Sequence, residues 1–237
     1  QKDSRHWWNV RVDAATGEVV AKNDWVVTDD WGSYRPESVV QGSDSLVVTP
    51  GYTTPSPVAD GSSYQVYEIP AESPNHAFPP PPAEGRTTVN QPAHAQASPF
   101  AWHDTNGVAG AESTLTIGNN AQAYLDLAND NTPTIPADFP ADGGAGLDFA
   151  SPIDHTLAPS AYRPAVVANL FYWNNLMHDI NYLYGFDEAH TNFQENNYGR
   201  GGLGSDSVNA EAQDSGNTNN ANFATPAEGS NPRMQMY

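Results

Sequence analysis

The stretch from residue 164 to residue 204 constrains the fold most, because it begins with the longest helical pattern of apolar residues in the chain. Six apolar residues recur there at intervals of three or four, as on one face of a helix: Val166, Leu170, Trp173, Met177, Ile180 and Tyr184. Four more widen that face: Val167, Phe171, Leu176 and Leu183. So broad a face predicts one long, buried helix over about residues 161–184. Pro164 suits its first turn and Gly185 its C-terminal end.

A polar strip runs along the same predicted helix: Asn174, Asn175, His178, Asp179 and Asn181. One interpretation is that the strip faces solvent. The other is that its side chains are buried and find hydrogen-bond partners, since unpaired buried polar groups cost stability. His178 and Asp179 point about 100° apart on a helix and do not readily share a ligand site. A structural hydrogen-bonding role is therefore predicted for both.

The charge of the chain excludes two classes of partner. Its 237 residues carry 9 Lys and Arg against 28 Asp and Glu, a formal net charge of −19. That charge repels nucleic acid and anionic membranes and suits an extracellular protein that binds calcium. The absence of cysteine excludes disulfides, thiolate metal sites and cysteine nucleophiles. The chain contains no uninterrupted apolar run of about 18 residues, so no membrane span is predicted.

The remaining periodic segments predict β-structure, which makes the expected fold class α+β. Residues 7–20 are typical of a β-hairpin with Gly17 in its turn. Further strands are predicted at residues 63–70, 113–123 and 207–213, and from Arg233 onward. Between residues 28 and 63 the periodicity disappears, which indicates a junction of the kind that proteases cut.

Two segments resemble ligand-binding motifs only weakly. Asp104, Asn106 and Glu112 offer closely spaced oxygen ligands for calcium, but the twelve-residue EF-hand pattern is missing and turn chemistry is favoured. The glycines between Gly199 and Gly204 lack the Gly-Lys-Ser/Thr of a phosphate loop.

Several stretches, taken together in order and spacing, resemble the fungalysin family of secreted zinc metallopeptidases, which are thermolysin-like. They are residues 169–186, 192–202, 206–214, 219–226 and 233–237. Residues 98–107 and 118–121 are similar to the bacterial branch of that family. The resemblance implies that residues 63–237 form the N-terminal, β-rich part of a peptidase catalytic domain. Residues 1–28 would be the C-terminal tail of a propeptide, including the hairpin, and residues 29–62 the processing junction, as in an unprocessed zymogen.

The catalytic motif of such enzymes is absent from this chain. Zincins need His-Glu-x-x-His on a helix, and none of the seven histidines is followed by glutamate. The resemblance therefore implies no catalytic or metal-ligating residue in this chain, with zinc ligands expected beyond Tyr237. It implies peptide or protein substrates, the C-terminal zinc-binding lobe of the same peptidase as partner, and calcium as a further stabilising ion.

The same resemblance assigns a substrate-binding role to five residues: Asn219, Asn220, Ala221, Asn222 and Phe223. They would form an edge strand along the active-site cleft, to which an extended peptide adds through main-chain hydrogen bonds. Without the flanking likeness, an Asn-rich turn would be the simpler interpretation. His178 and Asp179 become positioning or structural residues near the zinc helix.

A competing hypothesis is a non-catalytic extracellular module that binds calcium or glycans or mediates adhesion. The acidic surface, the clustered oxygen ligands and the 11% aromatic content favour it. A His-Glu-x-x-His motif further along the parent protein would decide for the enzyme.

Overall fold

The computed structural model describes residues 8–12, 16, 19–24, 59–69 and 85–237. The chain divides into two compact units, residues 1–46 and 47–237, and each is described by itself. Most of the predicted junction at residues 29–62 lies outside the described residues, so that boundary stays a prediction.

The first unit contains a β-hairpin, as the sequence predicts. Strand β1 (Trp8–Val12) pairs antiparallel with β2 (Val19–Asp24), with a register shift between Arg11 and Val12. Most of the connecting turn, including Gly17, lies outside the described residues. That this hairpin belongs to a propeptide stays a prediction.

The second unit begins with a three-stranded sheet. Strand β3 (Ser63–Val66) lies between β4 (Thr87–Asn90), which is antiparallel to it, and β6 (Asp148–Phe149), which is parallel. Tyr64 and Val66 are fully buried while the alternate residues are half-buried. This alternation confirms the strand predicted at the start of residues 63–70.

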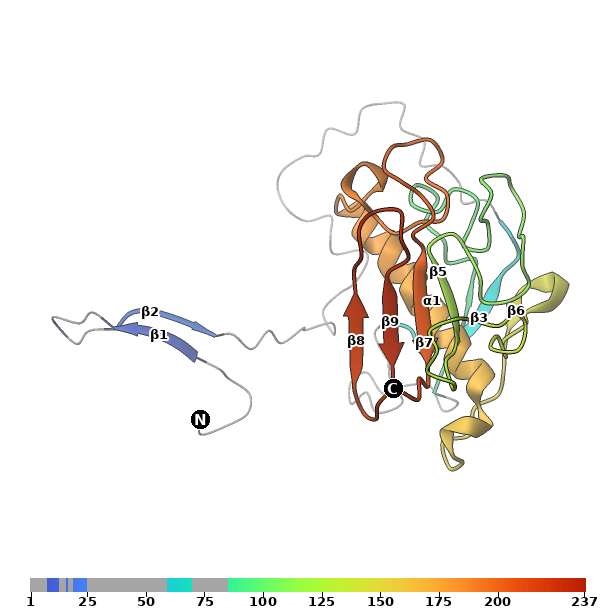
Figure 1. Cartoon of the computed structure of the whole chain (residues 1–237), viewed down its shortest axis with the longest axis horizontal. Helices are drawn as coiled ribbons and strands as arrows, with labels where there is room; N and C mark the ends of the chain where they lie inside the picture. Colours follow the sequence, from blue (N-terminus) through green and yellow to red (C-terminus); the bar gives the residue numbers. More distant parts are fainter. Residues whose placement is uncertain (1–7, 13–15, 17–18, 25–58, 70–84) are drawn as a thin grey trace. The chain divides into compact units, whose positions relative to one another are not determined.

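A four-stranded sheet carries the rest of the β-structure (Figure 1). Its order is β5 (Ala121–Leu125), β7 (Val208–Ala212), β9 (Arg233–Met236) and β8 (Ala221–Ala224). The first three strands are mutually parallel, and β8 is antiparallel to β9. The strands predicted at residues 207–213 and from Arg233 onward are confirmed as β7 and β9.

The strand predicted at residues 113–123 is wrong for most of its length. Ile117 forms an isolated antiparallel bridge with Gln122, so the chain turns back on itself before β5 begins at Ala121. Gly118 allows that turn to press against a neighbouring loop, because a Cβ there would lie 1.9 Å from the carbonyl oxygen of Trp102. In this turn the apolar Leu115 and Ile117 are only half-buried, whereas the polar Thr116, Asn119 and Asn120 are buried.

Helix α1 (Arg163–Leu183) is the only α-helix among the described residues and lies close to its predicted bounds. Pro164 stands in the first turn. Gly185 has φ of +97° and donates its N–H to the Tyr182 carbonyl at 3.0 Å, which closes the C-terminal end. No helix in the described ranges is long and apolar enough to cross a bilayer.

The face that α1 buries is only partly the predicted one: Val167 and Phe171 are fully buried as expected, but the central stripe is not. The fully or nearly buried residues are Ala165, Val167, Ala168, Phe171, Tyr172, Asn175, His178, Asp179 and Tyr182. The predicted stripe is less covered: Val166, Leu170 and Trp173 are half-buried, Met177 is 39% exposed and Tyr184 is 82% exposed. The helix is apolar on nearly all sides, so periodicity alone does not show which side meets the sheets.

The middle of the polar strip on α1 is buried, so the interpretation that the strip faces solvent is wrong there. Asn175, His178 and Asp179 are buried, Asn174 is half-buried and only Asn181 is exposed. Asp179 accepts from Ser98 Oγ at 2.6 Å, and the Asn175 amide nitrogen donates to the Phe171 carbonyl at 2.9 Å, while Asn175 Oδ1 has no partner.

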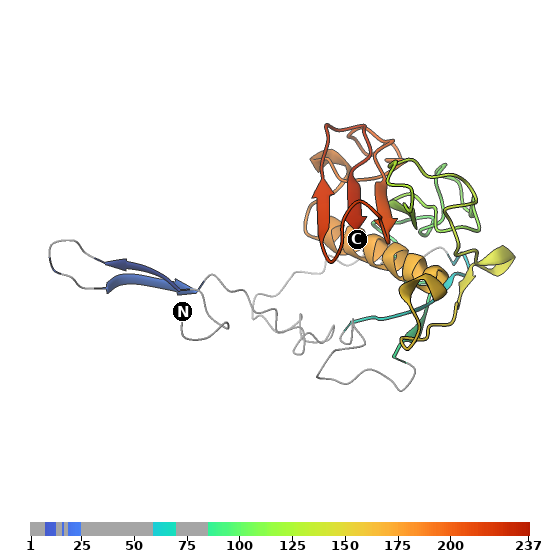
Figure 2. The same cartoon turned by 60° about the horizontal axis from the view of Figure 1, so that its bottom comes forward.

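The core lies where α1 crosses the four-stranded sheet and contacts β3 (Figure 2). Its centre is a group of buried rings in which Tyr64 stacks on Phe149 with centroids 5.2 Å apart. His103 stacks between Phe149 and Phe171. Both nitrogens of its ring form hydrogen bonds: Nε2 lies 2.7 Å from Tyr64 Oη, and Nδ1 lies 3.2 Å from the Ile117 carbonyl oxygen. The second unit is thus an α+β lobe built on one helix and two mixed sheets.

Candidate functional site

Strand β8 forms an open edge of the four-stranded sheet. It pairs with β9 on one side, and no described strand pairs with it on the other. All four of its residues are exposed. Unpaired edges of this kind are where an additional strand can bind, because main-chain donors and acceptors are available.

The register shows which main-chain groups face outward. Tyr237 donates its N–H to the Asn220 carbonyl at 3.1 Å, so residues 220 and 237 are a hydrogen-bonded pair. Hydrogen-bonded and non-bonded pairs alternate along an antiparallel ladder, so Asn222 bonds to β9 in the same way. The N–H and C=O groups of Ala221 and Phe223 therefore point away from β9, toward the open edge.

The asparagine side chains beside this edge differ in their contacts. The Asn222 amide donates to Gln235 Oε1 at 2.9 Å and to Tyr237 Oη at 2.6 Å, which holds it on the sheet. Within the part of the chain that the structure describes, the amide of Asn220 has no hydrogen-bond partner. Asn219 has φ of +52°, a left-handed conformation that asparagine tolerates well. The free Asn220 amide can donate to or accept from a bound ligand.

An aromatic surface accompanies the edge. The Phe223 ring is 44% exposed and lies 6.1 Å, centroid to centroid, from the ring of Phe193, which in turn packs edge-on against Phe186. Beyond β8 the chain turns at Thr225 and Pro226 along a cavity of about 290 Å³ lined partly by Phe186 and Phe193. The edge thus combines free main-chain groups with an apolar surface.

His178 and Asp179 lie in a hydrogen-bonded part of the core. Asp179 accepts from the His94 N–H at 2.8 Å, Ser98 Oγ at 2.6 Å and Trp102 Nε1 at 2.9 Å. His178 Nδ1 lies 3.1 Å from Asp179 Oδ1, and its Nε2 lies 3.4 Å from the Asn192 amide. Both residues thus have structural partners, and neither belongs to a group of metal-ligating side chains among the described residues.

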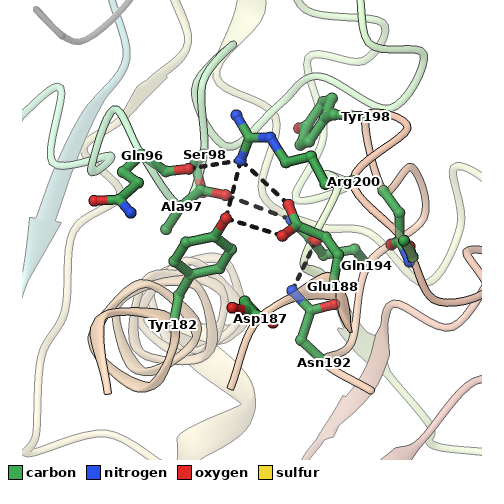
Figure 3. Close-up of polar contacts among 12 residues, drawn as sticks. Gln96, Ala97, Ser98, Tyr182, Asp187, Glu188, Asn192, Gln194, Tyr198 and Arg200 are labelled. Carbon is green, nitrogen blue, oxygen red and sulfur yellow. Dashed lines mark hydrogen bonds and ion pairs between the residues drawn. The ribbon is translucent and has the colours of Figure 1, made fainter. Parts of the chain in front are cut away.

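A charged cluster at the end of α1 was missed by sequence reasoning (Figure 3). Arg200 Nη1 donates to Glu188 Oε1 at 3.2 Å, to Tyr182 Oη at 3.1 Å and to the Gln96 carbonyl at 2.8 Å. Tyr182 Oη donates to Glu188 Oε2 at 2.9 Å. Burial, and then the hydrogen bond and charge of Glu188, raise the pKa of Tyr182, so the phenol keeps its proton.

The Arg200 cluster ties the glycine-rich loop to the helix end and to the loop before Ala97. A signal for it existed: Arg200 is one of only nine Lys and Arg residues in a strongly acidic chain, and it stands alone among glycines. Glu188 is 2% exposed, and a buried carboxylate needs a partner, which Arg200 supplies.

The weak calcium candidates of the loop at residues 104–112 serve turn chemistry. Glu112 accepts from the Thr105 N–H at 2.7 Å and from the Asn106 amide. Asp104 accepts from the Gly107 N–H at 3.0 Å and from Tyr198 Oη at 3.2 Å. These oxygens bond to donors of the loop itself and to Tyr198, which agrees with the turn chemistry favoured from the sequence.

The donor sets of the described residues do not fit a catalytic zinc ion. The side chains that do gather as potential metal ligands are Asp126, Glu211 and Asp214, a set without histidine. Catalytic zinc sites contain at least one histidine among three protein ligands, as in sets of three histidines, two histidines with a glutamate, or two cysteines with a histidine. His103 is excluded by its surroundings, since both ring nitrogens are engaged inside the aromatic core.

A groove of about 700 Å³ runs along the exposed side of α1. It is lined by Val166, Leu170, Trp173 and Met177 from the helix and by Met234, Met236 and Tyr237 from the end of the chain, among others. This is the stripe that the sequence predicts as buried. Its apolar side chains are only partly covered within the described residues.

Comparison with known proteins identifies the class of protein that this fold and edge belong to. Residues 63–237 match the family described as Fungalysin metallopeptidase (M36), so the chain belongs to the fungalysin family. The family resemblance inferred from the sequence motifs is thereby confirmed.

Three relatives are named as extracellular metalloproteinases. Extracellular metalloproteinase 5 of Trichophyton tonsurans is 38% identical over 183 residues, which are 74% of this chain and 27% of that protein. Extracellular metalloproteinase MEP of Fusarium vanettenii is 38% identical over 181 residues, 76% of this chain and 26% of that protein. The MEP protein of Leptosphaeria maculans is 37% identical over 184 residues, with shares of 75% and 28%. The chain therefore spans about a quarter of the length of these curated relatives, all of them fungal; the likeness to a bacterial branch stays a prediction.

Proposed function

We propose that this chain is the substrate-binding lobe of a secreted zinc-dependent endopeptidase. The observation that carries the proposal is the open edge of β8, where the main-chain groups of Ala221 and Phe223 face away from the sheet. Membership of the fungalysin family and the names of the relatives support the reaction class and the secretion.

An extended peptide would bind by adding a strand to β8. The outward N–H and C=O groups of Ala221 and Phe223 would pair with the peptide main chain, a mode that needs little sequence specificity. The small side chain of Ala221 leaves room for close approach, and the free Asn220 amide would bond to the peptide backbone. Asn219 and Asn222 would hold the ends of this segment in shape, and Phe223 would contact an apolar side chain of the substrate.

The remainder of the peptidase is the partner that we propose for the groove along α1. A helix face with Leu170, Trp173 and Met177 half-exposed is costly in water, so a covering segment gains free energy from its burial. The relatives supply such a segment in principle, since this chain covers only about a quarter of their length. We propose that a C-terminal, zinc-binding lobe packs there and contributes the zinc ligands and the catalytic glutamate.

His178 and Asp179 are proposed as positioning residues for that arrangement. Asp179 gathers donors from the loop at residues 94–102, and His178 bridges Asp179 and Asn192. Together they would fix the orientation of α1, and hence the groove, without touching substrate or metal. Residues 1–28 are proposed to be the tail of a propeptide, removed by cleavage within residues 29–62.

The proposal is tested in the complete parent protein by replacing Asn220 with alanine. The expected result is a raised KM and a lowered kcat/KM for peptide hydrolysis, with little change in thermal stability because Asn220 is exposed. Asn217→Ala, an exposed change three residues earlier, is the matched control and should keep wild-type kinetics. Unchanged kinetics in Asn220→Ala would overturn the role of the edge.

Zinc content and hydrolysis of the parent protein separate the enzyme from a non-catalytic module. One zinc per molecule, with peptide hydrolysis that a chelator abolishes, supports the endopeptidase. A parent protein that binds no zinc and cleaves no peptide would replace the proposal by a binding or adhesion role.

A further inference from the structure

Three acidic side chains from distant parts of the sequence meet inside the lobe. Asp126 directly follows β5, Glu211 lies within β7 and Asp214 follows β7. Because β5 and β7 are parallel neighbours, their C-terminal ends lie at the same edge of the sheet. One oxygen from each carboxylate lies within 4.8 Å of the others.

All three carboxylates are removed from solvent. Asp126 is 3% exposed, Glu211 0% and Asp214 2%. Buried acidic residues are rare unless they are paired or coordinate a metal, because an unpaired buried charge is strongly disfavoured. Three of them at one place require either a compensating cation or the protonation of one member.

The hydrogen bonds of the two aspartates shape the cluster without filling it. Asp126 accepts from the N–H groups of Asp130 at 3.1 Å and Asn131 at 2.9 Å. Asp214 accepts from the Gly216 N–H at 2.6 Å and from Gln235 Nε2 at 2.5 Å. Each carboxylate oxygen has more than one lone-pair direction, so one neutral donor per oxygen leaves acceptor capacity.

Glu211 is the member whose bonding is incomplete. Its Oε1 accepts from Tyr124 Oη at 3.0 Å, whereas its buried Oε2 has no hydrogen-bond partner. Arg233 Nε lies 3.9 Å from Oε2, beyond hydrogen-bond distance, and that nitrogen is likewise buried without a partner. One arginine facing three carboxylates leaves an excess of two negative charges.

We propose that Asp126, Glu211 and Asp214 bind a calcium ion, with the unpartnered Oε2 of Glu211 as one ligand. The donors are all oxygens, which hard cations prefer over zinc or copper. Calcium takes oxygen ligands at about 2.3–2.6 Å, so ligands on opposite sides of the ion lie about 5 Å apart, in keeping with a cluster spread over 4.8 Å. A divalent ion also cancels the excess of two charges.

The ion would strengthen the contact between two loops that already meet, since the Ser215 N–H donates to the Asp126 carbonyl at 3.0 Å. Asp126 begins the loop at residues 126–131, and Asp214 begins the turn that leads toward β8. Asp214 also holds Gln235, whose other amide atom accepts from Asn222 on β8. Calcium bound here would therefore stabilise the lobe and the base of its open edge, and it requires no peptidase activity to do so.

Without a cation, the cluster has one other way to lower its charge. Burial, reinforced by Asp126 and Asp214, raises the pKa of Glu211 to about 7, although Tyr124 and Arg233 oppose the rise. A protonated Glu211 would make the cluster a purely structural hydrogen-bond network. The experiment separates these two states by measuring binding directly.

The test uses chain 1–237, stripped with a chelator and desalted into metal-free buffer. Isothermal titration with CaCl₂ should give one site per chain, and calcium should raise the unfolding temperature. Terbium should occupy the same site and luminesce on tyrosine excitation, because Tyr124 Oη lies 3.0 Å from a ligand carboxylate. Added calcium should then quench that emission by displacement.

Variants assign the site. Asp214→Asn removes one ligand charge at nearly constant shape and should weaken calcium binding at least tenfold. Glu112→Gln, in the exposed loop at residues 104–112, is the matched control and should bind as the wild type does. Circular dichroism establishes that each variant is folded.

A second arm remains informative if Asp214→Asn fails to fold. Tyr124→Phe keeps all three carboxylates, so it should retain calcium binding by calorimetry while losing most of the terbium emission. The proposal is overturned if the wild type binds no calcium, if Glu112→Gln abolishes binding, or if Tyr124→Phe leaves the terbium emission unchanged.

Discussion

Asp179 accepts the indole N–H of Trp102 at 2.9 Å, and this bond joins the buried side of α1 to a loop 77 residues earlier in the chain. The same carboxylate accepts from Ser98 and from the His94 N–H, and all of these groups except that of His94 are buried. The bonds explain why the polar strip of α1 faces inward: Asp179 supplies the acceptor that this loop needs to fold over the helix.

Replacing Asp179 by alanine should destabilise the lobe by about 3–5 kcal/mol, because several buried donors lose their partner at once. Urea unfolding of chain 1–237, followed by far-UV circular dichroism, measures the loss. Asp154→Asn, an exposed change, should cost less than about 0.5 kcal/mol. Equal stabilities for the two variants would contradict a structural role for Asp179.

Acid should destabilise the lobe through His103. Burial lowers the pKa of this histidine to about 4, against about 6.5 when unfolded. Below pH 6.5 the unfolded chain binds a proton at His103 that the folded chain does not bind. The free energy of unfolding therefore falls by up to about 3 kcal/mol as the pH drops from 6.5 toward 4.

His103→Gln should flatten that dependence, because glutamine does not titrate. The free energy of unfolding is measured by urea titration at several pH values between 4 and 7, with the exposed His94→Gln as control. Parallel pH profiles for the wild type and His103→Gln would argue against a neutral, buried histidine.

Arg200→Ala should destabilise the lobe because Glu188, 2% exposed, would keep a buried charge without its partner. The expected loss is about 3–5 kcal/mol. The double variant Arg200→Ala with Glu188→Gln removes that charge and should recover part of the loss in thermal unfolding. The stability lost on adding Glu188→Gln to Arg200→Ala is then compared with the loss that Glu188→Gln causes in the wild type. Equal losses would mean that the two side chains are not coupled.

Met177→Asp should lower the unfolding temperature of the complete parent protein far more than that of chain 1–237. Met177 is 39% exposed in the groove along α1, so the change should lower the unfolding temperature of chain 1–237 only slightly. If the rest of the peptidase covers the groove, the parent should lose far more, since a charge would be buried unpaired. Val108→Asp, at a site 65% exposed, is the control; equal shifts in both proteins for Met177→Asp would leave the groove uncovered.

Much of the helix could be predicted from sequence, whereas its orientation could not. The helical spacing, Pro164 and Gly185 together give bounds within a few residues of the observed Arg163–Leu183. The buried side depends on Asp179 meeting donors from a loop some 80 residues earlier, and on His178 meeting Asn192 beyond the end of the helix. Local periodicity carries no such information. The apolar stripe at Leu170 and Trp173 is real, but it lines a groove instead of the core.

The candidate sites likewise divide into a part that can be predicted from the sequence and a part that depends on the tertiary fold. The segment Asn219–Phe223 was predicted by family resemblance, because four exposed residues in β8 carry almost no periodic signal of their own. The cluster of Asp126, Glu211 and Asp214 exists only because β5 and β7 pair in parallel, 87 residues apart in register. Strand pairing over that distance is set by the tertiary fold and has no local signature.

The most direct test of the account compares two proline substitutions on β8 in the complete parent protein. Ala221→Pro removes an N–H that points to the open edge, where proline is tolerated, while Asn222→Pro removes one that bonds to β9. The account predicts that Ala221→Pro keeps its unfolding temperature within a few degrees but loses roughly tenfold or more in kcat/KM for peptides, and that Asn222→Pro is clearly less stable. A folded Ala221→Pro protein with wild-type kcat/KM would contradict substrate binding at the edge of β8.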